Sequence, residues 1–220
     1  MVLLDKKGTD ATLAEALAQK GEKKFVQSID LAVNFQDVDF KKQEGRINVE
    51  VVLPFEPKPT KVCVFADGQV GLDAKKAGAD LVISSAEIDS YAKDKKKMTA
   101  LLDYSLLAVP QLMVPVGKAL GKVLGAKGKT PKPMPPAANM ASLISNSRRT
   151  LTLKAKGKFL PSVHCIVGKE NMAKEQIVEN ILAVFAALER SDFGKNVKSV
   201  FIKTTMGKPV KLGAAAKAAA

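Results

Sequence analysis

Apolar and polar residues follow three successive patterns along the chain. In residues 25–35 and 47–53 they alternate with a period of two, which predicts two strands, each with one polar face, that form an antiparallel pair. Residues 62–109 instead hold short, continuously apolar runs between helical segments, which is typical of a parallel sheet covered on both faces. Beyond residue 150 the alternation returns. The patterns therefore predict an α+β segment, an α/β segment and a second α+β segment.

The proline-rich break at residues 54–59 separates the first two patterns. Besides the two strands above, the predicted strands lie at 62–65, 80–84, 106–109, 151–154, 162–167 and 197–204. The predicted helices lie at 11–20, 72–77, 85–97, 111–124, 140–146 and 174–190, of which the last has the clearest apolar stripe. We expect a middle domain, residues 61–149, to be inserted into a discontinuous outer domain of residues 1–60 and 150–220.

The composition predicts a folded chain that binds polyanions. Of its 220 residues 46% are apolar, and 35 Lys and Arg exceed 22 Asp and Glu, which gives a formal net charge of +13. Such a charge attracts phosphates through counterion release. An anionic membrane is a weaker candidate, because no strongly basic amphipathic helix is predicted.

We expect a cytoplasmic chain without a membrane anchor. The apolar stretch 106–117 is too short to span a bilayer and contains two prolines. The first seven residues lack the basic-then-apolar order of a signal peptide. Cys63 and Cys165 lie in apolar runs without metal-ligand spacing, which indicates buried free thiols in a reducing compartment.

The segment Gly125–Thr130, with the sequence GAKGKT, ends as a phosphate-binding P-loop does. That motif also needs a glycine at the position of Val123 and a helix after the threonine, whereas four prolines follow between residues 131 and 136. Nucleotide binding is therefore a poor interpretation. We expect an extended basic loop with Lys127, Lys129 and Lys132, of a length that is usually functional, although a solvated loop stays the alternative.

Three glycines, Gly117, Gly121 and Gly125, recur at every fourth residue in and just after the predicted helix 111–124. They would leave one helix face without side chains, at a cost of about 0.5–1 kcal/mol each relative to alanine. A close approach to the helix backbone has to offset that cost. A packed neighbouring strand is the ordinary explanation, and an RNA backbone is the more specific one.

Two segments at strand ends could recognise RNA. Residues 203–208, KTTMGK, combine hydroxyls, an exposed backbone and flanking lysines, which suits ribose hydroxyls and phosphates; an ordinary strand end and turn is the alternative. In residues 23–28, KKFVQS, Phe25 is either a core residue or a platform for sugar and base. His164, the only histidine, lies in an apolar strand and is more typical of a core or interface residue than of a catalyst.

The sequence offers no metal-ligand spacing and no activated nucleophile. We therefore expect no enzyme activity, no metal and no cofactor. Two other classes of protein stay open as competitors of an RNA-binding protein. One is a nucleotide-dependent enzyme built on the α/β segment, and the other is a cytosolic scaffold with a basic face.

Four segments occur in an order and spacing that carry a family resemblance: residues 25–31 (FVQSIDL), 124–133 (LGAKGKTPKP), 167–169 (VGK) and 203–208 (KTTMGK). With them the chain resembles the universal ribosomal protein L-one family, the large-subunit stalk protein, in its archaeal and eukaryotic branch. The resemblance covers nearly all of residues 9–212. It implies an α+β first domain built from both ends of the chain and an inserted, Rossmann-like, three-layer α/β second domain.

The resemblance also implies which residues bind RNA. In the first domain the matching positions are Lys24, Phe25, Ser28, Asp30, His164, Gly168, Lys169, Lys203, Thr204, Thr205, Met206 and Gly207. In the second domain they lie in the glycine-rich loop: Gly125, Lys127, Gly128 and Lys129. The family usually has Leu-Gly-Pro-Arg-Gly in this loop. Ala126 stands in place of the family's proline, so a φ constraint is lost. Lys127 stands in place of the arginine, so a planar, bidentate phosphate contact is lost.

The function that the resemblance implies is that of a structural protein of the large ribosomal subunit. Such a protein would bind the ribosomal RNA of the mobile stalk, assist release of deacylated transfer RNA at the exit site, and repress translation by binding its own messenger RNA. The expected partners are these three RNAs. We expect no membrane partner and a monomer when the protein is free.

Overall fold

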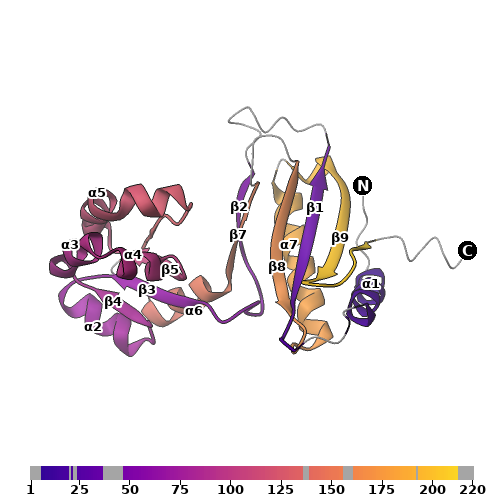
Figure 1. Cartoon of the computed structure of the whole chain (residues 1–220), viewed down its shortest axis with the longest axis horizontal. Helices are drawn as coiled ribbons and strands as arrows, with labels where there is room; N and C mark the ends of the chain where they lie inside the picture. Colours follow the sequence, from indigo (N-terminus) through magenta and orange to yellow (C-terminus); the bar gives the residue numbers. More distant parts are fainter. Residues whose placement is uncertain are drawn as a thin grey trace, which may run out of the picture. The chain divides into compact units, whose positions relative to one another are not determined.

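The computed structural model describes residues 6–19, 21, 24–36, 47–135, 139–155, 161–191 and 193–212. The chain divides into two compact units, here named unit 1 (Met1–Lys58 with Arg149–Ala220) and unit 2 (Pro59–Arg148) (Figure 1). Unit 1 thus comes from both ends of the chain, and unit 2 is inserted between them.

Unit 1 is built on a four-stranded antiparallel sheet. Its strands are β1 (Ser28–Phe35), β8 (Ser162–Lys169), β9 (Val197–Thr204) and β10 (Val210–Lys211), in the order β10-β9-β1-β8. The inward side chains of β1 share one core with residues of helices α1 (Lys6–Ala18) and α7 (Lys174–Arg190), and α7 lies behind the sheet in Figure 1. The outward residues of β1, among them Ser28, Asp30 and Asn34, are only half-buried.

The alternation of β1 is the reason for this arrangement. Ile29, Leu31, Val33 and Phe35 are at most 2% exposed, so a strand with one apolar face becomes the centre of a sheet whose other face stays polar. Helix α7 spans the predicted residues 174–190, and β9 spans the predicted 197–204; both predictions are confirmed. Helix α1 begins five residues before the predicted residue 11.

The predicted antiparallel pairing of residues 25–35 with 47–53 is wrong. Strand β2 (Asn48–Val52) pairs with β7 (Thr150–Lys154), and β1 pairs with β8 and β9. Alternation determines which face of a strand is buried but not which strand lies beside it. Strands β2 and β7 flank the two places where the chain crosses between the units, so their pairing holds both crossings together within unit 1.

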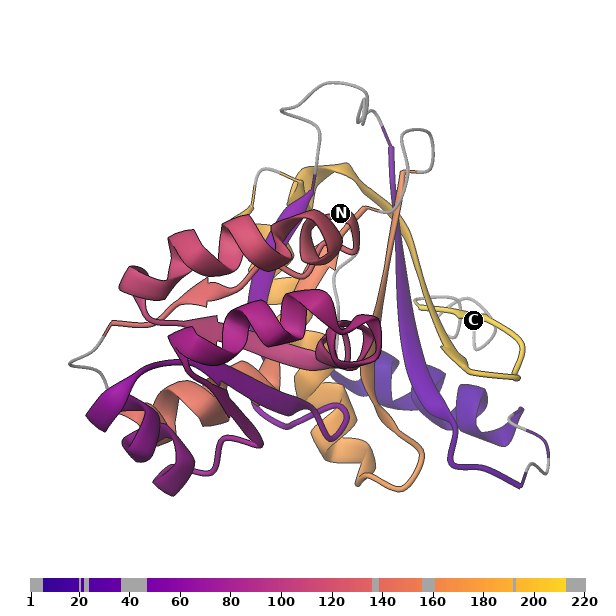
Figure 2. The same cartoon turned by 60° about the vertical axis from the view of Figure 1, so that its left-hand side comes forward.

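Unit 2 is a parallel sheet with helices on both faces. Its strands are β3 (Lys61–Phe65), β4 (Leu81–Ile83), β5 (Tyr104–Ala108) and β6 (Lys132–Pro133), in the order β4-β3-β5-β6. Its helices are α2 (Gly68–Lys76), α3 (Ser85–Lys93), α4 (Lys95–Leu101), α5 (Pro110–Ala126) and α6 (Met140–Arg149). Residues of α3, α4 and α5 share one core, and residues of α2 and α6 share a second core on the other face (Figure 2). The predicted mixture of α+β and three-layer α/β structure is confirmed.

Two features of unit 2 go beyond the prediction. The predicted helix 85–97 is two helices, because Asp94 has an extended backbone and its Oδ1 accepts hydrogen bonds from the Lys96 and Lys97 amides (2.9 and 3.4 Å). The loop after α5 is extended, as predicted, and Lys132–Pro133 adds a short strand to the sheet edge beside β5.

Both cysteines are buried and free, as predicted. Burial raises the pKa of the Cys63 thiol and of the Cys165 thiol to about 12, which keeps both thiols protonated at neutral pH. Within the part of the chain that the structure describes, no helix is long and apolar enough to cross a membrane.

Candidate functional site

Most of the residues predicted to bind RNA in unit 1 come together at one end of its sheet. Because β1 is antiparallel to both neighbours, its first residue lies beside their last residues. Ser28 is paired with Lys169 of β8, and Ile29 is paired with Thr204 of β9. The segments around 24–28, 168–169 and 203–207, which are distant in sequence, therefore meet. The exposed and half-buried members of this group form what we call the strand-end surface: Lys24, Phe25, Ser28, Lys169, Lys203, Thr205, Met206 and Gly207.

Hydrogen bonds between Ser28 and Thr205 join two of these segments, and we call this set of hydrogen bonds the lock. The Ser28 amide donates to Thr205 Oγ1 (3.0 Å), and the Thr205 hydroxyl lies 3.3 Å from the Ser28 carbonyl oxygen, to which it can donate. The Thr205 amide donates to the same carbonyl oxygen (3.0 Å). The Thr205 hydroxyl thus holds the backbone of Ser28 in place, which fixes the positions of both polar residues.

Gln27 adds two further hydrogen bonds that hold these segments together, and the sequence did not predict this role. Its side chain is 1% exposed, and its Oε1 accepts a hydrogen bond from the Met206 amide (3.0 Å). Its carbonyl oxygen accepts a hydrogen bond from the Glu170 amide (3.0 Å). A signal for it exists in the sequence, because Gln27 is a polar residue in the same alternating register as Ile29 and Leu31.

Two apolar side chains project from the strand-end surface. Phe25 is 50% exposed and Met206 is 61% exposed, on the two segments that the hydrogen bonds join. The interpretation of Phe25 as a core residue is wrong, since β1 begins only at Ser28 and residues 24–26 are exposed. Exposed Lys24 directly precedes Phe25 in the sequence.

Three of the predicted residues, Gly168, Thr204 and Gly207, are buried or half-buried and lie close to other atoms of unit 1. Thr204 is fully buried, and its Oγ1 has no hydrogen-bond partner among the described residues. A Cβ at Gly207 would collide with that same Oγ1. A Cβ at Gly168 would approach Ile177 Cγ1 to 3.0 Å and Met172 Sδ to 3.3 Å. Glycine at 168 and 207 therefore lets the chain pass close to its own side chains.

Asp30 lies one step further into the open face, opposite Lys203 of β9. Partial burial raises the pKa of the Asp30 carboxyl, and the charges of Lys203 and His164 oppose the rise. His164 is exposed on β8, with Ser162 Oγ 3.5 Å from its Nε2. The core interpretation of His164 is therefore wrong.

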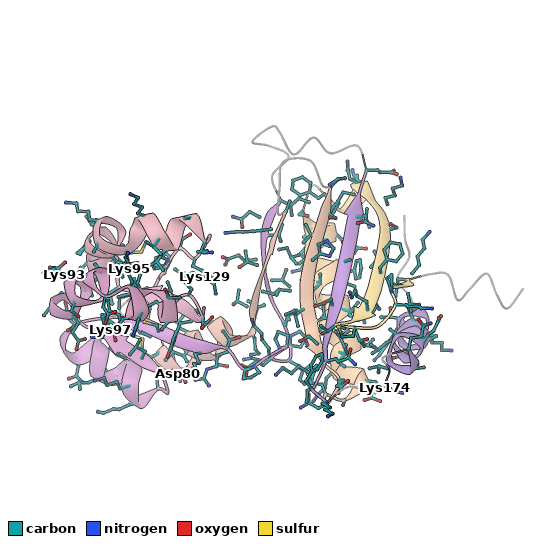
Figure 3. The ribbon with its side chains drawn as sticks, viewed as in Figure 1. Asp80, Lys93, Lys95, Lys97, Lys129 and Lys174 are labelled. Carbon is teal, nitrogen blue, oxygen red and sulfur yellow. The ribbon has the colours of Figure 1, made fainter. Side chains whose placement is uncertain are left out.

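The predicted residues of the glycine-rich loop, Gly125, Lys127, Gly128 and Lys129, lie in unit 2, where α5 ends. Gly128 has a positive φ of 67°, which ends the helix in a left-handed turn. Lys129, labelled in Figure 3, extends its Nζ to 3.4 Å from the Tyr104 carbonyl oxygen at the start of β5. A helix precedes this loop and a strand follows it, the reverse of a P-loop.

The glycines of α5 have no packing partner in the part of the chain that the structure describes. A Cβ added at Gly117, Gly121 or Gly125 would meet no atom within 4 Å in the described structure. The expectation that a neighbouring strand packs against them is wrong, because the sheet lies on the opposite side of the helix, against Leu112, Val116, Leu120 and Leu124. Among the described residues, no group of three His, Cys, Asp or Glu side chains could hold a metal ion.

Comparison with known proteins decides the family. The model of the ribosomal protein L1p/L10e family matches residues 15–208. The chain belongs to this family. The resemblance inferred from the four sequence segments is thereby confirmed, and a nucleotide-dependent enzyme is set aside because the family consists of ribosomal proteins. As a ribosomal protein the chain is cytoplasmic, as predicted.

Several archaeal members of the family match along almost their whole length, and each carries the name large ribosomal subunit protein uL1. The protein from Archaeoglobus fulgidus is 38% identical over 217 residues, which cover 96% of this chain and 100% of that protein. The protein from Methanobrevibacter smithii is 40% identical over 204 residues (90% of this chain, 95% of that protein). The protein from Thermofilum pendens is 39% identical over 210 residues (92% of each).

Proposed function

We propose that the chain binds ribosomal RNA of the large subunit through the strand-end surface of unit 1. The observation that carries the proposal is the lock between Ser28 and Thr205, which presents short polar groups and the exposed side chains of Phe25 and Met206 on one preformed surface. A preformed surface loses little conformational entropy when it binds. The names of the relatives support the large subunit as the place of binding.

The chemistry of this surface suits the shape of RNA better than its charge alone. Lys24, Lys169 and Lys203 supply affinity that depends on salt, at about one released counterion for each phosphate contact. Hydroxyls and exposed backbone can hydrogen-bond ribose 2′-hydroxyls, which distinguish RNA from DNA. Phe25 offers a ring on which a sugar or an unstacked base can pack.

The finer functions are proposed on the family resemblance. On the ribosome the protein would hold the stalk RNA and assist release of deacylated transfer RNA from the exit site. Away from it, the strand-end surface would bind a segment of the protein's own messenger RNA that imitates the ribosomal site, and so repress translation. We also propose that the glycine-rich loop of unit 2 adds an RNA contact, and that the two units are domains with the predicted boundaries.

A substitution at Thr205 tests the role of the lock. Thr205→Val removes the hydroxyl that holds Ser28 but no charge, so affinity for stalk ribosomal RNA should fall about tenfold, the loss of one to two hydrogen bonds. The slope of log Kd against log salt should stay the same. Thr152→Val, at an exposed threonine on β7, is the matched control and should bind as the parent does.

Competition in a gel shift at fixed salt completes this test. The parent should prefer the stalk RNA to an unrelated RNA duplex, and Thr205→Val should lose most of that preference. Equal competition by both RNAs against the parent would mean a scaffold with a basic face, and the proposal would then fail. A changed salt slope at unchanged affinity would exclude the positioning role of Thr205.

A further inference from the structure

The outer face of α5 is a surface that the proposed function does not use. It consists of Val114, Gly117, Lys118, Gly121 and Lys122, which are exposed or half-buried, and Val114 is 63% exposed. Figure 2 shows α5 lying along one face of the sheet. Within the described part of unit 2, the helix is covered on its inner side only, where its leucines and Val116 share a core with residues of the sheet and α3. Three internal glycines weaken a helix. Since no described residue packs against them, the described part of the fold does not explain them.

This face has a charge of one sign. No Asp or Glu occurs between residues 104 and 149, whereas Lys118 and Lys122 lie there, one helical turn apart. Among the described residues, no hydrogen bond or ion pair engages either lysine. A flat ridge beside two unpaired cations is complementary to a polyanion that comes close to the helix backbone.

The other group of lysines in unit 2 is a weaker candidate. Lys93, Lys95 and Lys97 lie on α3 and α4 (Figure 3), where acidic residues, among them Asp89 and Asp94, are interspersed with them. Lys97 also has a partner within the unit, because its Nζ lies 5.4 Å from the centre of the Tyr91 ring. The acidic residues of unit 2 all lie between positions 67 and 103, so α5 belongs to a stretch of the sequence whose charged residues are all basic.

The form of the α5 face favours double-stranded RNA. Single-stranded RNA is usually held by aromatic side chains on which bases stack, and α5 contains no Phe, Tyr or Trp. The minor groove of an RNA duplex is wide and shallow and displays 2′-hydroxyls. A helix ridge without side chains can approach such a groove closely, while neighbouring lysines reach the phosphates at its edge.

We propose that the outer face of α5 docks on the backbone of double-stranded RNA, with Lys118 and Lys122 on phosphates and the ridge of Gly117 and Gly121 against the minor groove. The proposal extends the proposed RNA binding to a second surface, and it is tested separately from the first. Recognition here depends on the shape of the duplex. The contact therefore contributes affinity without sequence preference.

The first test compares two pairs of lysines in the full-length protein. The probe is a 20-base-pair RNA duplex of arbitrary sequence, and the readout is the slope of log Kd against log salt. Lys118→Gln with Lys122→Gln should reduce the slope by about 1.5, at 0.7 to 0.9 for each phosphate contact. Lys75→Gln with Lys76→Gln, at exposed positions of α2, is the charge-matched control and should leave it nearly unchanged. Equal slopes for the two double variants would overturn the proposal.

The second test adds a side chain to the ridge without changing charge. Gly121→Gln should keep or raise the melting temperature, because glutamine is the better helix former. It should nevertheless weaken duplex binding roughly tenfold, since two lysine contacts and the close approach are lost together. Unchanged duplex affinity in a folded Gly121→Gln protein would overturn the proposal. An equal loss on a single-stranded 20-mer would overturn the choice of double-stranded RNA.

The Thr205→Val variant separates this inference from the proposed function. It should lose preference for stalk RNA and keep the parent's salt slope on the plain duplex. If its slope on the plain duplex fell as far as that of the α5 double variant, the assignment of that slope to α5 would be wrong. If instead stalk RNA preference survived in Thr205→Val, the strand-end proposal would fail while the α5 result stood.

Discussion

The strand-end surface of unit 1 and the outer face of α5 in unit 2 are built in opposite ways. At the strand ends, buried polar groups and close backbone contacts fix a few short side chains, and the lysines lie around them. On α5 the surface combines exposed helix backbone with lysines, and no described residue packs against its glycines. A surface that depends on fixed short groups can discriminate among RNAs, whereas one that depends on charge and access provides affinity.

The largest expected effect concerns the buried support of unit 1. Asn180 of α7 is fully buried; its Nδ2 donates to the Val167 carbonyl oxygen (2.8 Å), and its Oδ1 accepts from the Phe55 amide (3.0 Å). Asn180→Ala leaves both backbone groups without this partner, at a cost of about 2–4 kcal/mol in the free energy of unfolding. Hydrogen exchange should show lower protection in α7 and β8.

The same hydrogen-exchange experiment compares the stability of the two units. Unit 2 has a core of its own, so protection in α5 and β3 should not change in Asn180→Ala. Asn171→Ala, at an exposed asparagine before α7, is the matched control and should leave both units as they are. An equal loss of protection in both units would show that they unfold together and that their contrast in construction has no energetic consequence.

Two glycine-to-alanine substitutions, one in each unit, should change the free energy of unfolding in opposite directions. Gly207→Ala places a Cβ against Thr204 Oγ1, so residues 204–207 must shift, at a cost of about 1–2 kcal/mol. Gly121→Ala meets no atom and replaces the poorer helix former, so it should stabilise the protein by about 0.5–1 kcal/mol. Denaturant unfolding checks both values.

Measurements of RNA binding by the same two variants extend the comparison. Gly207→Ala should lower affinity for stalk RNA, because it displaces Thr205 and Met206. A single methyl group at residue 121 should lower affinity for a plain duplex only slightly. If both variants were less stable than the parent, the α5 ridge would have an internal packing role, and the contrast between the two surfaces would be removed.

The sequence predicted the parts of this fold in which one pattern decides the outcome. The apolar stripe of α7 and the alternation of β9 gave their bounds correctly, because burial of a continuous face suffices to determine each. The partner of β2 was not predictable in this way, since Thr150–Lys154 is almost 100 residues away in the chain and alternation carries no information about pairing.

The resemblance predicted which residues form the candidate site, but it did not predict the physical role of each residue. The resemblance marked Thr204 and Thr205 alike, yet one is fully buried and the other exposed and bonded to Ser28. Gln27 was missed although its register predicts an inward polar side chain. For the α5 glycines, the sequence showed the cost, and only the structure shows that no contact with a described residue offsets it.

The smallest expected effect concerns the charge of Asp30 on the open face of unit 1. Burial raises the pKa of its carboxyl above the ordinary 3.8, so the carboxylate opposes folding at neutral pH. Asp30→Asn should therefore make the protein slightly more stable than the parent at pH 7. The difference should shrink as the pH falls through the raised pKa and vanish below the ordinary value, where the parent carboxyl is protonated in both states.

The same variant tests whether Asp30 contributes to discrimination among RNAs. A carboxylate between Lys203 and His164 repels phosphates that approach without the right geometry. Asp30→Asn should thus bind an unrelated duplex slightly more tightly and prefer stalk RNA less. Asp89→Asn, at an exposed residue of α3, makes the same change of charge in unit 2 and should tighten duplex binding without altering the preference. If both variants changed the preference equally, discrimination would depend on net charge, and the distinction between the two surfaces would be lost.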